Sequence, residues 1–408
     1  MSSEARQDML VFLLTKAVPA RTTRVVTVGG VLRREEMDLV INPLDFKALQ
    51  AADYAKRYNG GKLVAVSMGP DFKVKPLLSE LYSHPIEGVD EAYILSDRRM
   101  AGADTWATAY TLSLGLKKVL DVNKAAVDEV LELVESGAPP ERVLERAREL
   151  YHSNLLPNLI YTEKPGLPQG VVQRYAEGKA GAEEVREALE KVRTELDRFL
   201  IVAGLKTSDG ETGSTGPQTA EALSDALGKR IPDITHVTDF EVDAESGTLI
   251  AVRKLGSYVQ RLRSPLPCLI TIVPEYRAGV TPVVRRKRAA LFSYKGKVRE
   301  VRVWNADDIG ADPDKIGLAG SPTIVGPGID IGGPPVQKFV GRTRVFTQRV
   351  EAFEFNGQKY GPFERFAKAD DLPEELVREL EAKGLVKTFD LRDLLEEVLG
   401  GVVVTAKH

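Results

Sequence analysis

The residues best suited to chemistry lie in one short segment, GLKTSDGETGSTGP, which covers residues 204–217. It combines four glycines, five hydroxyl side chains and two carboxylates in fourteen positions. Glycine lets backbone amides approach an anion closely, and hydroxyl groups donate to phosphate or ribose oxygens. The segment lacks the Gly-Lys-Ser/Thr end of a Walker A loop and the GxGxxG spacing of a dinucleotide turn. Its composition favours a nucleotide-binding loop, with a flexible surface connection as the alternative.

Three other motifs carry polar or polarisable groups near apolar runs. They are NPLD (42–45), VSMGP (66–70) and GADTWATA (102–109). Each also has a purely structural interpretation. Asn or Asp before a helix is a good cap, and methionine at the end of a strand is more often buried than a ligand.

The remaining chemistry-bearing residues exclude several classes of protein. One cysteine, Cys268, and four scattered histidines cannot build a disulfide framework, a Cys/His metal cluster or an iron–sulfur centre within this chain. No histidine lies at a strand end beside an obvious nucleophile, which argues against a hydrolytic triad. We therefore expect no catalytic side chain and no metal, and any redox chemistry would need a bound cofactor.

Charge and hydropathy limit the partners and the compartment. The 56 Lys and Arg nearly balance the 59 Asp and Glu, so no global basic field attracts nucleic acid. The basic run RRKRAAL (285–291) is either a docking face or a solvated charged surface. No window approaches the roughly 18 apolar residues of a membrane helix, and the N-terminus has no basic stretch leading into an apolar region. We expect a cytoplasmic protein without membrane insertion.

The elements that position these motifs follow an alternating pattern. Apolar runs at 9–18, 62–69, 92–97 and 199–204 are separated by helical segments, which predicts an α/β fold with a doubly wound, mostly parallel sheet. Helices are expected to start at Pro43, near Asp104 or Thr105, and at Pro217 after a cap at Thr215 or Gly216. Their N-termini converge at the carboxyl ends of the strands, in a crevice that favours anions.

The chain divides into four predicted parts. Residues 1–119 and 199–335 form the two parts of the α/β domain, the second with an antiparallel layer from about residue 231 to 303. Residues 120–198 read as a helical insertion, because apolar positions recur at three-and-four spacing. Residues 336–408 form a C-terminal extension with a strand-rich piece and two amphipathic helices, LPEELVRELEAKG and LRDLLEEVLGG.

Six blocks, in this order along the chain, resemble the beta subunit of electron transfer flavoproteins. They are LLTKAVPA, NPLDFKALQAA, VAVSMGP, LSDRRMAGADTWATAYTL, DGETGSTGPQTAEAL and VWNADDIGADPDKIGLAGSPT. The resemblance covers about residues 9–118 and 199–325 and departs from the family pattern at Glu211 and Ser214. The GADT motif and the loop ending in Gly-Pro look more like the electron-bifurcating or nitrogen-fixation-associated branches than the mitochondrial type.

The resemblance implies an adenine-nucleotide-binding fold and an alpha-subunit partner. It also implies AMP, or the AMP half of FAD, in the beta-subunit site. The positions that match family contacts, together with those near the same strand ends, are Leu14, Asn42, Pro43, Leu44, Asp45, Met68, Asp104, Thr105, Thr108, Thr207, Ser208, Asp209, Gly210, Glu211, Thr212, Gly213, Ser214, Thr215, Gly216, Pro217 and Gln218.

Two functions follow as hypotheses. In the first, the chain binds FAD or AMP and, with the alpha subunit, carries electrons from a dehydrogenase or NADH to an acceptor such as a quinone-reducing partner, with electron bifurcation as a variant. In the second, the chain is a scaffold subunit whose AMP is structural. An adenylating enzyme is disfavoured because the chain lacks a Ser-Gly-Gly-rich pyrophosphate loop. The helical insertion either packs against the alpha subunit or docks a redox partner.

Overall fold

The computed structural model describes residues 9–20, 27–28, 31–32, 38–82, 88–277, 300–323 and 343–389. The chain forms two compact units, residues 1–328 and 329–408, and each is described by itself. The basic run at 285–291 and the second C-terminal helix expected at LRDLLEEVLGG lie outside the described residues.

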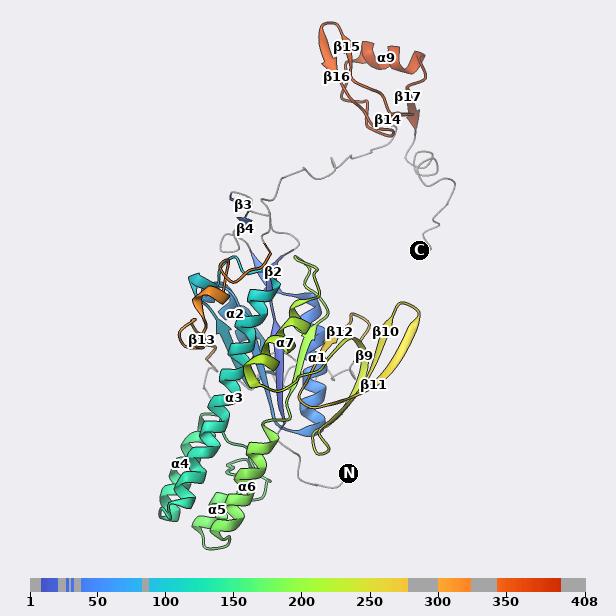
Figure 1. The fold of residues 1–408 in the computed structure, drawn as a ribbon. Coiled ribbons are helices and arrows are strands. Elements are labelled where there is room, and N and C mark those ends of the chain that lie inside the picture. Colours follow the sequence, from blue (N-terminus) through green and yellow to red (C-terminus); the bar gives the residue numbers. More distant parts are fainter. Residues whose placement is uncertain are drawn as a thin grey trace. The chain divides into compact units, whose positions relative to one another are not determined.

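The first unit is built on a nine-stranded sheet with the strand order β11-β10-β9-β12-β8-β1-β6-β7-β13 (Figure 1). The strands are β1 (Leu10–Thr15), β6 (Lys62–Met68), β7 (Glu91–Leu95), β8 (Leu200–Gly204), β9 (Asp233–Asp243), β10 (Thr248–Leu255), β11 (Tyr258–Pro265), β12 (Cys268–Ile272) and β13 (Arg302–Trp304). Neighbouring strands are parallel along the stretch β9-β12-β8-β1-β6-β7-β13. At one edge, β10 pairs antiparallel with both β9 and β11, so these strands extend the same sheet. The predicted α/β class with a mostly parallel sheet is confirmed.

Helices cover both faces of the sheet. α1 (Pro43–Asn59) and α2 (Asp71–Tyr82) pack on one face, and α3 (Thr105–Glu135) and α7 (Thr215–Leu227) pack on the other. The central strand β1 is buried at all six positions, which explains its continuous apolar sequence LVFLLT. Alternate side chains of β1 therefore belong to two separate hydrophobic cores.

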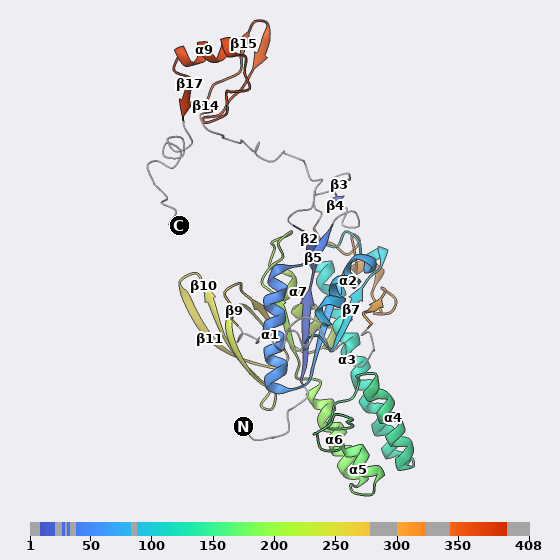
Figure 2. The same cartoon turned by 180° about the vertical axis from the view of Figure 1, so that it is seen from behind.

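Four helices extend beyond the sheet at the end remote from the C-terminal ends of its strands (Figures 1 and 2). They are the second half of α3, α4 (Pro140–His152), α5 (Val171–Ala176) and α6 (Ala182–Glu195). α3 is one helix of 31 residues, so it crosses the predicted domain boundary at 119/120 without a break. Lys62 anchors these helices to the sheet, because its Nζ donates to Glu91 Oε1 (3.1 Å), Asn123 Oδ1 (2.8 Å) and the Asn154 carbonyl (2.7 Å).

Short elements surround the sheet. The antiparallel pairs are β2 (Ala17–Pro19) with β5 (Leu39–Ile41), and β3 (Thr27–Val28) with β4 (Val31–Leu32). Two 3-10 turns are η2 (Arg98–Met100) and η4 (Pro313–Lys315). Arg99 joins two loops, because its guanidinium bonds both Asp97 (2.7 Å) and Asp307 (2.9 Å).

The second unit has its own small core. It consists of β14 (Thr343–Phe346) paired with β17 (Val386–Phe389), β15 (Phe353–Phe355) paired with β16 (Gln358–Tyr360), and α9 (Glu374–Ala382). α9 forms within the segment LPEELVRELEAKG, as its apolar spacing predicts. Phe346 is fully buried and stacks on Phe363 with ring centroids 4.4 Å apart.

Candidate functional site

The C-terminal ends of β1 and β8 mark the point where the winding of the sheet changes direction. The connection that follows β1 leads to α1 on one face, and β8 leads to α7 on the other. Ligands of open α/β sheets bind in the crevice at such a switch point. The structure brings together here the end of β1, the NPLD motif and the loop from Leu205 to Ser214.

Asn42 ties the NPLD motif to the loop. Its side-chain amide donates to Asp45 Oδ1 (2.8 Å) and to the Lys206 carbonyl (3.1 Å), and its oxygen accepts from the Ser208 amide (3.2 Å). Asn42 occupies the N-cap position of α1, with Pro43 following as predicted, but its side chain makes no cap bond to the helix. The completely buried Asn42 therefore holds the loop instead of capping α1.

Lys16 belongs to the LLTKAVPA block but is not among the predicted site residues, and it provides a second attachment for the loop. Its Nζ lies 2.9 and 2.8 Å from the two carboxylate oxygens of Asp209, and Gly210 N donates to the same carboxylate (2.7 Å). Burial acts to raise the pKa of Asp209, but the Lys16 ammonium and hydrogen bonds outweigh it, so this pKa lies well below its usual range. The carboxylate is neutralised within the loop and does not repel a phosphate from it.

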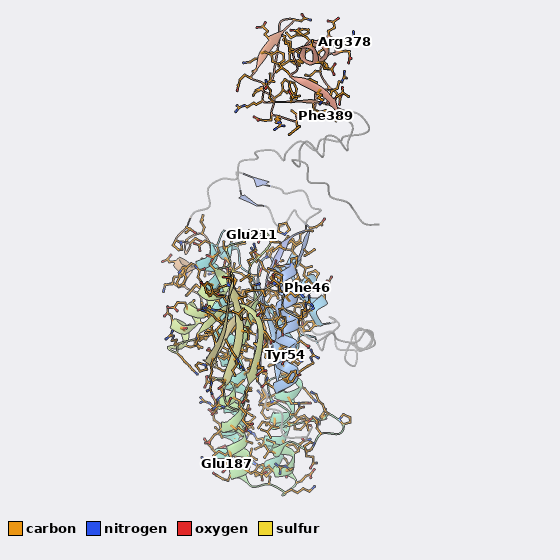
Figure 3. All side chains as sticks on the ribbon, turned by 90° about the vertical axis from the view of Figure 1, so that its right-hand side faces the viewer. Phe46, Tyr54, Glu187, Glu211, Arg378 and Phe389 are labelled. Atoms are coloured by element: carbon orange, nitrogen blue, oxygen red, sulfur yellow. The ribbon has the colours of Figure 1, made fainter. Side chains whose placement is uncertain are left out.

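Glu211, the other carboxylate of the loop, is exposed and pairs with Lys206 at 3.1 Å. Its φ of 51° places it in the left-handed region, which non-glycine residues seldom adopt. Figure 3 shows Glu211 at the end of the first unit opposite Glu187 of α6, so the loop and the protruding helices lie far apart. The departure from the family pattern at this position thus affects a surface pair.

Asp45 is the buried acid of the site. Its carboxylate accepts from the Lys16 amide (2.8 Å) and from Asn42, and only 5% of the residue is exposed. Burial raises the pKa of Asp45 to about 7, against hydrogen bonds that lower it. Gly204 leaves room for this carboxylate, because an added Cβ there would lie 2.5 Å from Asp45 Oδ1.

We expect the free energy of unfolding to decrease as the pH rises from about 4 to about 8. The folded protein holds the Asp45 proton with a pKa of about 7, compared with 3.8 for an ordinary aspartate. The stabilisation that Asp45 contributes is therefore complete below its unfolded-state pKa of 3.8, and it is lost as the pH rises through its folded-state pKa of about 7. The total loss in the free energy of unfolding is at most about 4 kcal/mol. Asp45→Asn has no proton to lose and should remove this slope in urea unfolding measured from pH 5 to 8. An unchanged slope in the variant would assign the effect to another group.

α7 supplies the amide groups of the site. It begins at Thr215, so the predicted start at Pro217 is wrong by two residues, and Gly216, Pro217 and Gln218 lie in its first turn. The N-cap Ser214 makes no side-chain cap bond. First-turn amides have no acceptor within a helix, and the helix dipole favours an anion there.

Several buried polar atoms at this end of the sheet lack partners among the described residues. Thr15 Oγ1 and Ser67 Oγ are two of them, and they occupy paired positions at the ends of β1 and β6. Gln218 Oε1 in the first turn of α7 is a third. Buried polar groups are nearly always hydrogen-bonded in complete structures. Their clustering around the loop fits a polar ligand, and the sequence gives no signal for Thr15 or Ser67.

The remaining predicted residues lie around the same end of the sheet. Leu14 is buried in the core under α3 and α7, and the partly buried Met68 packs against the same core. Asp104 caps α3, because one carboxylate oxygen accepts from the amides of Trp106 (3.0 Å) and Ala107 (2.9 Å). Its other oxygen accepts from the hydroxyl of Thr323 (2.6 Å). Both carboxylate oxygens are therefore used by the protein. Thr105 and Thr108 lie partly exposed in the first turns of α3, and their contact with a ligand stays a prediction.

Two other features, a metal site and a membrane-spanning helix, are not found among the described residues. The described residues contain no group of three or more His, Cys, Asp or Glu that could hold a metal ion. None of the helices in the described ranges has both the length and the apolar composition needed to cross a bilayer. The arrangement of amides, hydroxyls and neutralised carboxylates is suited to binding a phosphate-bearing ligand.

The chain is similar in sequence to known proteins over most of its length. The family model described as "Electron transfer flavoprotein domain" matches residues 29–126. The "Caffeyl-CoA reductase-Etf complex subunit CarD" of Acetobacterium woodii is 26% identical over 320 residues, covering 78% of this chain and 86% of the relative. The "Electron transfer flavoprotein subunit beta" of Thermoanaerobacterium thermosaccharolyticum is 27% identical over 318 residues, with the same coverage. "Protein FixA" of Azorhizobium caulinodans is 26% identical over 324 residues, covering 78% of this chain and 83% of the relative.

The similarity to these relatives extends over 83–86% of their own length. Residues 29–126 therefore match an electron transfer flavoprotein domain, and the chain as a whole is similar to proteins named as beta subunits of electron transfer flavoproteins.

Proposed function

We propose that this chain binds FAD or AMP in the crevice and, together with an alpha subunit, transfers electrons in the cytoplasm from a dehydrogenase or NADH to an acceptor. The observation that carries the proposal is the loop from Leu205 to Ser214, held at two points by Lys16 and Asn42. A loop fixed in this way presents its amides and hydroxyls without rearrangement on binding.

The proposal assigns each part of the nucleotide to a different element. The adenosine would lie near Leu14 and Met68 at the ends of β1 and β6, and the phosphate would lie at the first turn of α7. Thr212, Ser214 and Thr215 supply hydroxyl donors at the phosphate. A bound flavin supplies the electron-transfer chemistry, and the protein supplies binding, orientation and tuning.

The relatives support the bifurcating variant of this function. One is named as a subunit of a caffeyl-CoA reductase-Etf complex, and another is a FixA protein. In this variant the site would hold FAD, and the bound flavin would supply the chemistry for accepting a hydride from NADH and dividing the electron pair between two acceptors, one of them a quinone-reducing partner. The GADT motif and the loop ending in Gly-Pro favour the same branch.

The nucleotide content of the purified heterodimer tests the proposal. The chain is co-expressed with its alpha subunit, and the bound nucleotides are extracted and quantified. Two FAD for each heterodimer support bifurcation, whereas one FAD and one AMP support a simple carrier or a scaffold with structural AMP. Absence of any adenine nucleotide from the beta-subunit site would falsify the proposal.

A loop variant shows where the nucleotide binds. Gly213 has a φ of 67°, and valine is strained in that conformation, so Gly213→Val combined with Thr212→Ala should deplete the nucleotide of this subunit. The flavin of the alpha subunit should stay at its full content. Gly256→Val is the matched control, because Gly256 has a similar φ of 59° in the turn between β10 and β11. Equal depletion in both variants would indicate general misfolding.

A further inference from the structure

His236 has an unusual backbone in β9. Its φ is 61°, and β9 shifts register against β12 between Ile270 and Ile272, close to this residue. The His236 amide donates to the hydroxyl of Thr271 (3.2 Å), which is buried in β12. Bulges of this kind redirect side chains and are frequent beside functional sites, where the surrounding structure maintains the strain.

The imidazole of His236 also has no hydrogen-bond partner in the part of the chain that the structure describes. Nδ1 is buried without a hydrogen bond to any described residue. Nε2 makes no hydrogen bond within the described ranges, and it is not fully buried. By contrast, Nε2 of His152 in α4 lies 3.0 Å from Glu163 Oε2. Buried polar groups are nearly always hydrogen-bonded, so a ring without protein partners is a candidate for contact with a ligand.

Thr271 connects His236 with the start of α7. An added Cβ on Gly216 would lie 3.1 Å from Thr271 Cγ2, so the first turn of α7 lies directly over β12. Thr271 thus contacts this turn on one side and the amide of His236 on the other. Neighbouring strands lie about 4.8 Å apart, which places β9 roughly 10 Å beyond β8 along the edge of the sheet.

The proposed placement of the nucleotide gives a direction for a bound dinucleotide. With adenosine at β1 and β6 and phosphate at α7, the ligand would run along the strand order toward β12 and β9. AMP ends at its phosphate, whereas FAD continues with a second phosphate and a ribityl chain. In the strand order, β9 with His236 follows β12, in the direction in which FAD would continue beyond the phosphate of AMP.

We infer that His236 binds the flavin-side half of FAD, donating from Nε2 to the second phosphate or to a ribityl hydroxyl, and so favours FAD over AMP at this site. The inference rests on the proposed function, because it takes the adenine nucleotide to lie in the crevice. It adds a residue that determines which of the two nucleotides the site retains.

Affinities for FAD and AMP, measured on the nucleotide-depleted heterodimer by calorimetry, test this inference. His236→Phe should weaken FAD binding about 5- to 10-fold, in line with one lost hydrogen bond, and leave AMP binding within about 2-fold. His236→Asn keeps a polar group near the position of the ring, and asparagine tolerates the left-handed backbone, so it should retain most of the FAD affinity. His152→Phe is the matched control and should change neither affinity.

The outcomes separate the two proposals. A selective loss of FAD affinity in His236→Phe that Asn restores supports the inference. Equal loss of both ligands assigns His236 a purely structural role, and unchanged FAD affinity shows that it does not contact the ligand. Either result overturns the inference while the proposed function stands. If the wild-type protein binds neither FAD nor AMP at this subunit, the proposed function fails as well.

Discussion

Lys16→Met is expected to weaken adenine-nucleotide binding at the crevice by about 10- to 100-fold. The substitution leaves the carboxylate of Asp209 without its ammonium partner, and only 10% of that side chain is exposed. An uncompensated, largely buried charge destabilises its surroundings by several kcal/mol, and the loop can avoid this by moving away from the end of β1. Calorimetric titration of AMP into the heterodimer measures the effect.

A second lysine of the same loop provides the control. Lys206 pairs with Glu211 at 3.1 Å, but both side chains are exposed, so Lys206→Met should change the affinity by less than about 3-fold. The double variant Lys16→Met with Asp209→Asn removes the unpaired charge and should recover part of the loss. If Lys16→Met binds AMP as tightly as the wild-type protein, the ion pair does not organise the loop.

Gly204→Ala is expected to lower the free energy of unfolding by about 3 kcal/mol and to abolish nucleotide binding. The added Cβ would lie 2.5 Å from Asp45 Oδ1 and 3.0 Å from the carbonyl carbon of Leu44, and the backbone cannot yield as a flexible side chain would. Displacing Asp45 also removes the acceptor of the Lys16 amide and of Asn42. Urea unfolding combined with AMP titration gives both quantities.

Gly210→Ala tests whether the effect of Gly204→Ala comes from the steric clash of the added Cβ and not from the loss of a glycine in itself. Its added Cβ would have only Thr207 Oγ1 nearby, at 3.8 Å, which is an ordinary contact. We expect a change of less than about 0.5 kcal/mol in stability. Comparable losses in Gly204→Ala and Gly210→Ala would show that the close approach of Gly204 to Asp45 is unimportant.

The local elements of this fold can be predicted from the sequence because each depends on near neighbours. The buried strands β1 and β6 are continuous apolar runs, and Pro43 marks the start of α1. The start of α7 is misjudged because proline is tolerated throughout the first turn of a helix, where its missing amide breaks no hydrogen bond. Pro217 therefore does not identify the first residue of the helix.

Contacts between segments that are distant in the sequence cannot be predicted from local patterns of this kind. Lys16 and Asp209 are separated by 193 positions, and they meet because β1 and β8 are adjacent strands. Alternation of polar and apolar residues identifies strands but not their neighbours, so it cannot show that β10 and β11 extend the main sheet. The bulge that holds His236 depends on Thr271 of another strand and has no local signal.

The unbroken α3 has a practical consequence for following domain movements in solution. With 31 residues at about 1.5 Å each, it is a rod roughly 45 Å long that starts at the Asp104 cap and ends near α4. Lys62 fixes its middle to the sheet through Asn123. A fluorescent or spin label near Ser136 therefore turns together with the sheet of the first unit. Such a label would convert a small rotation at the crevice into a large displacement at the far end of the rod.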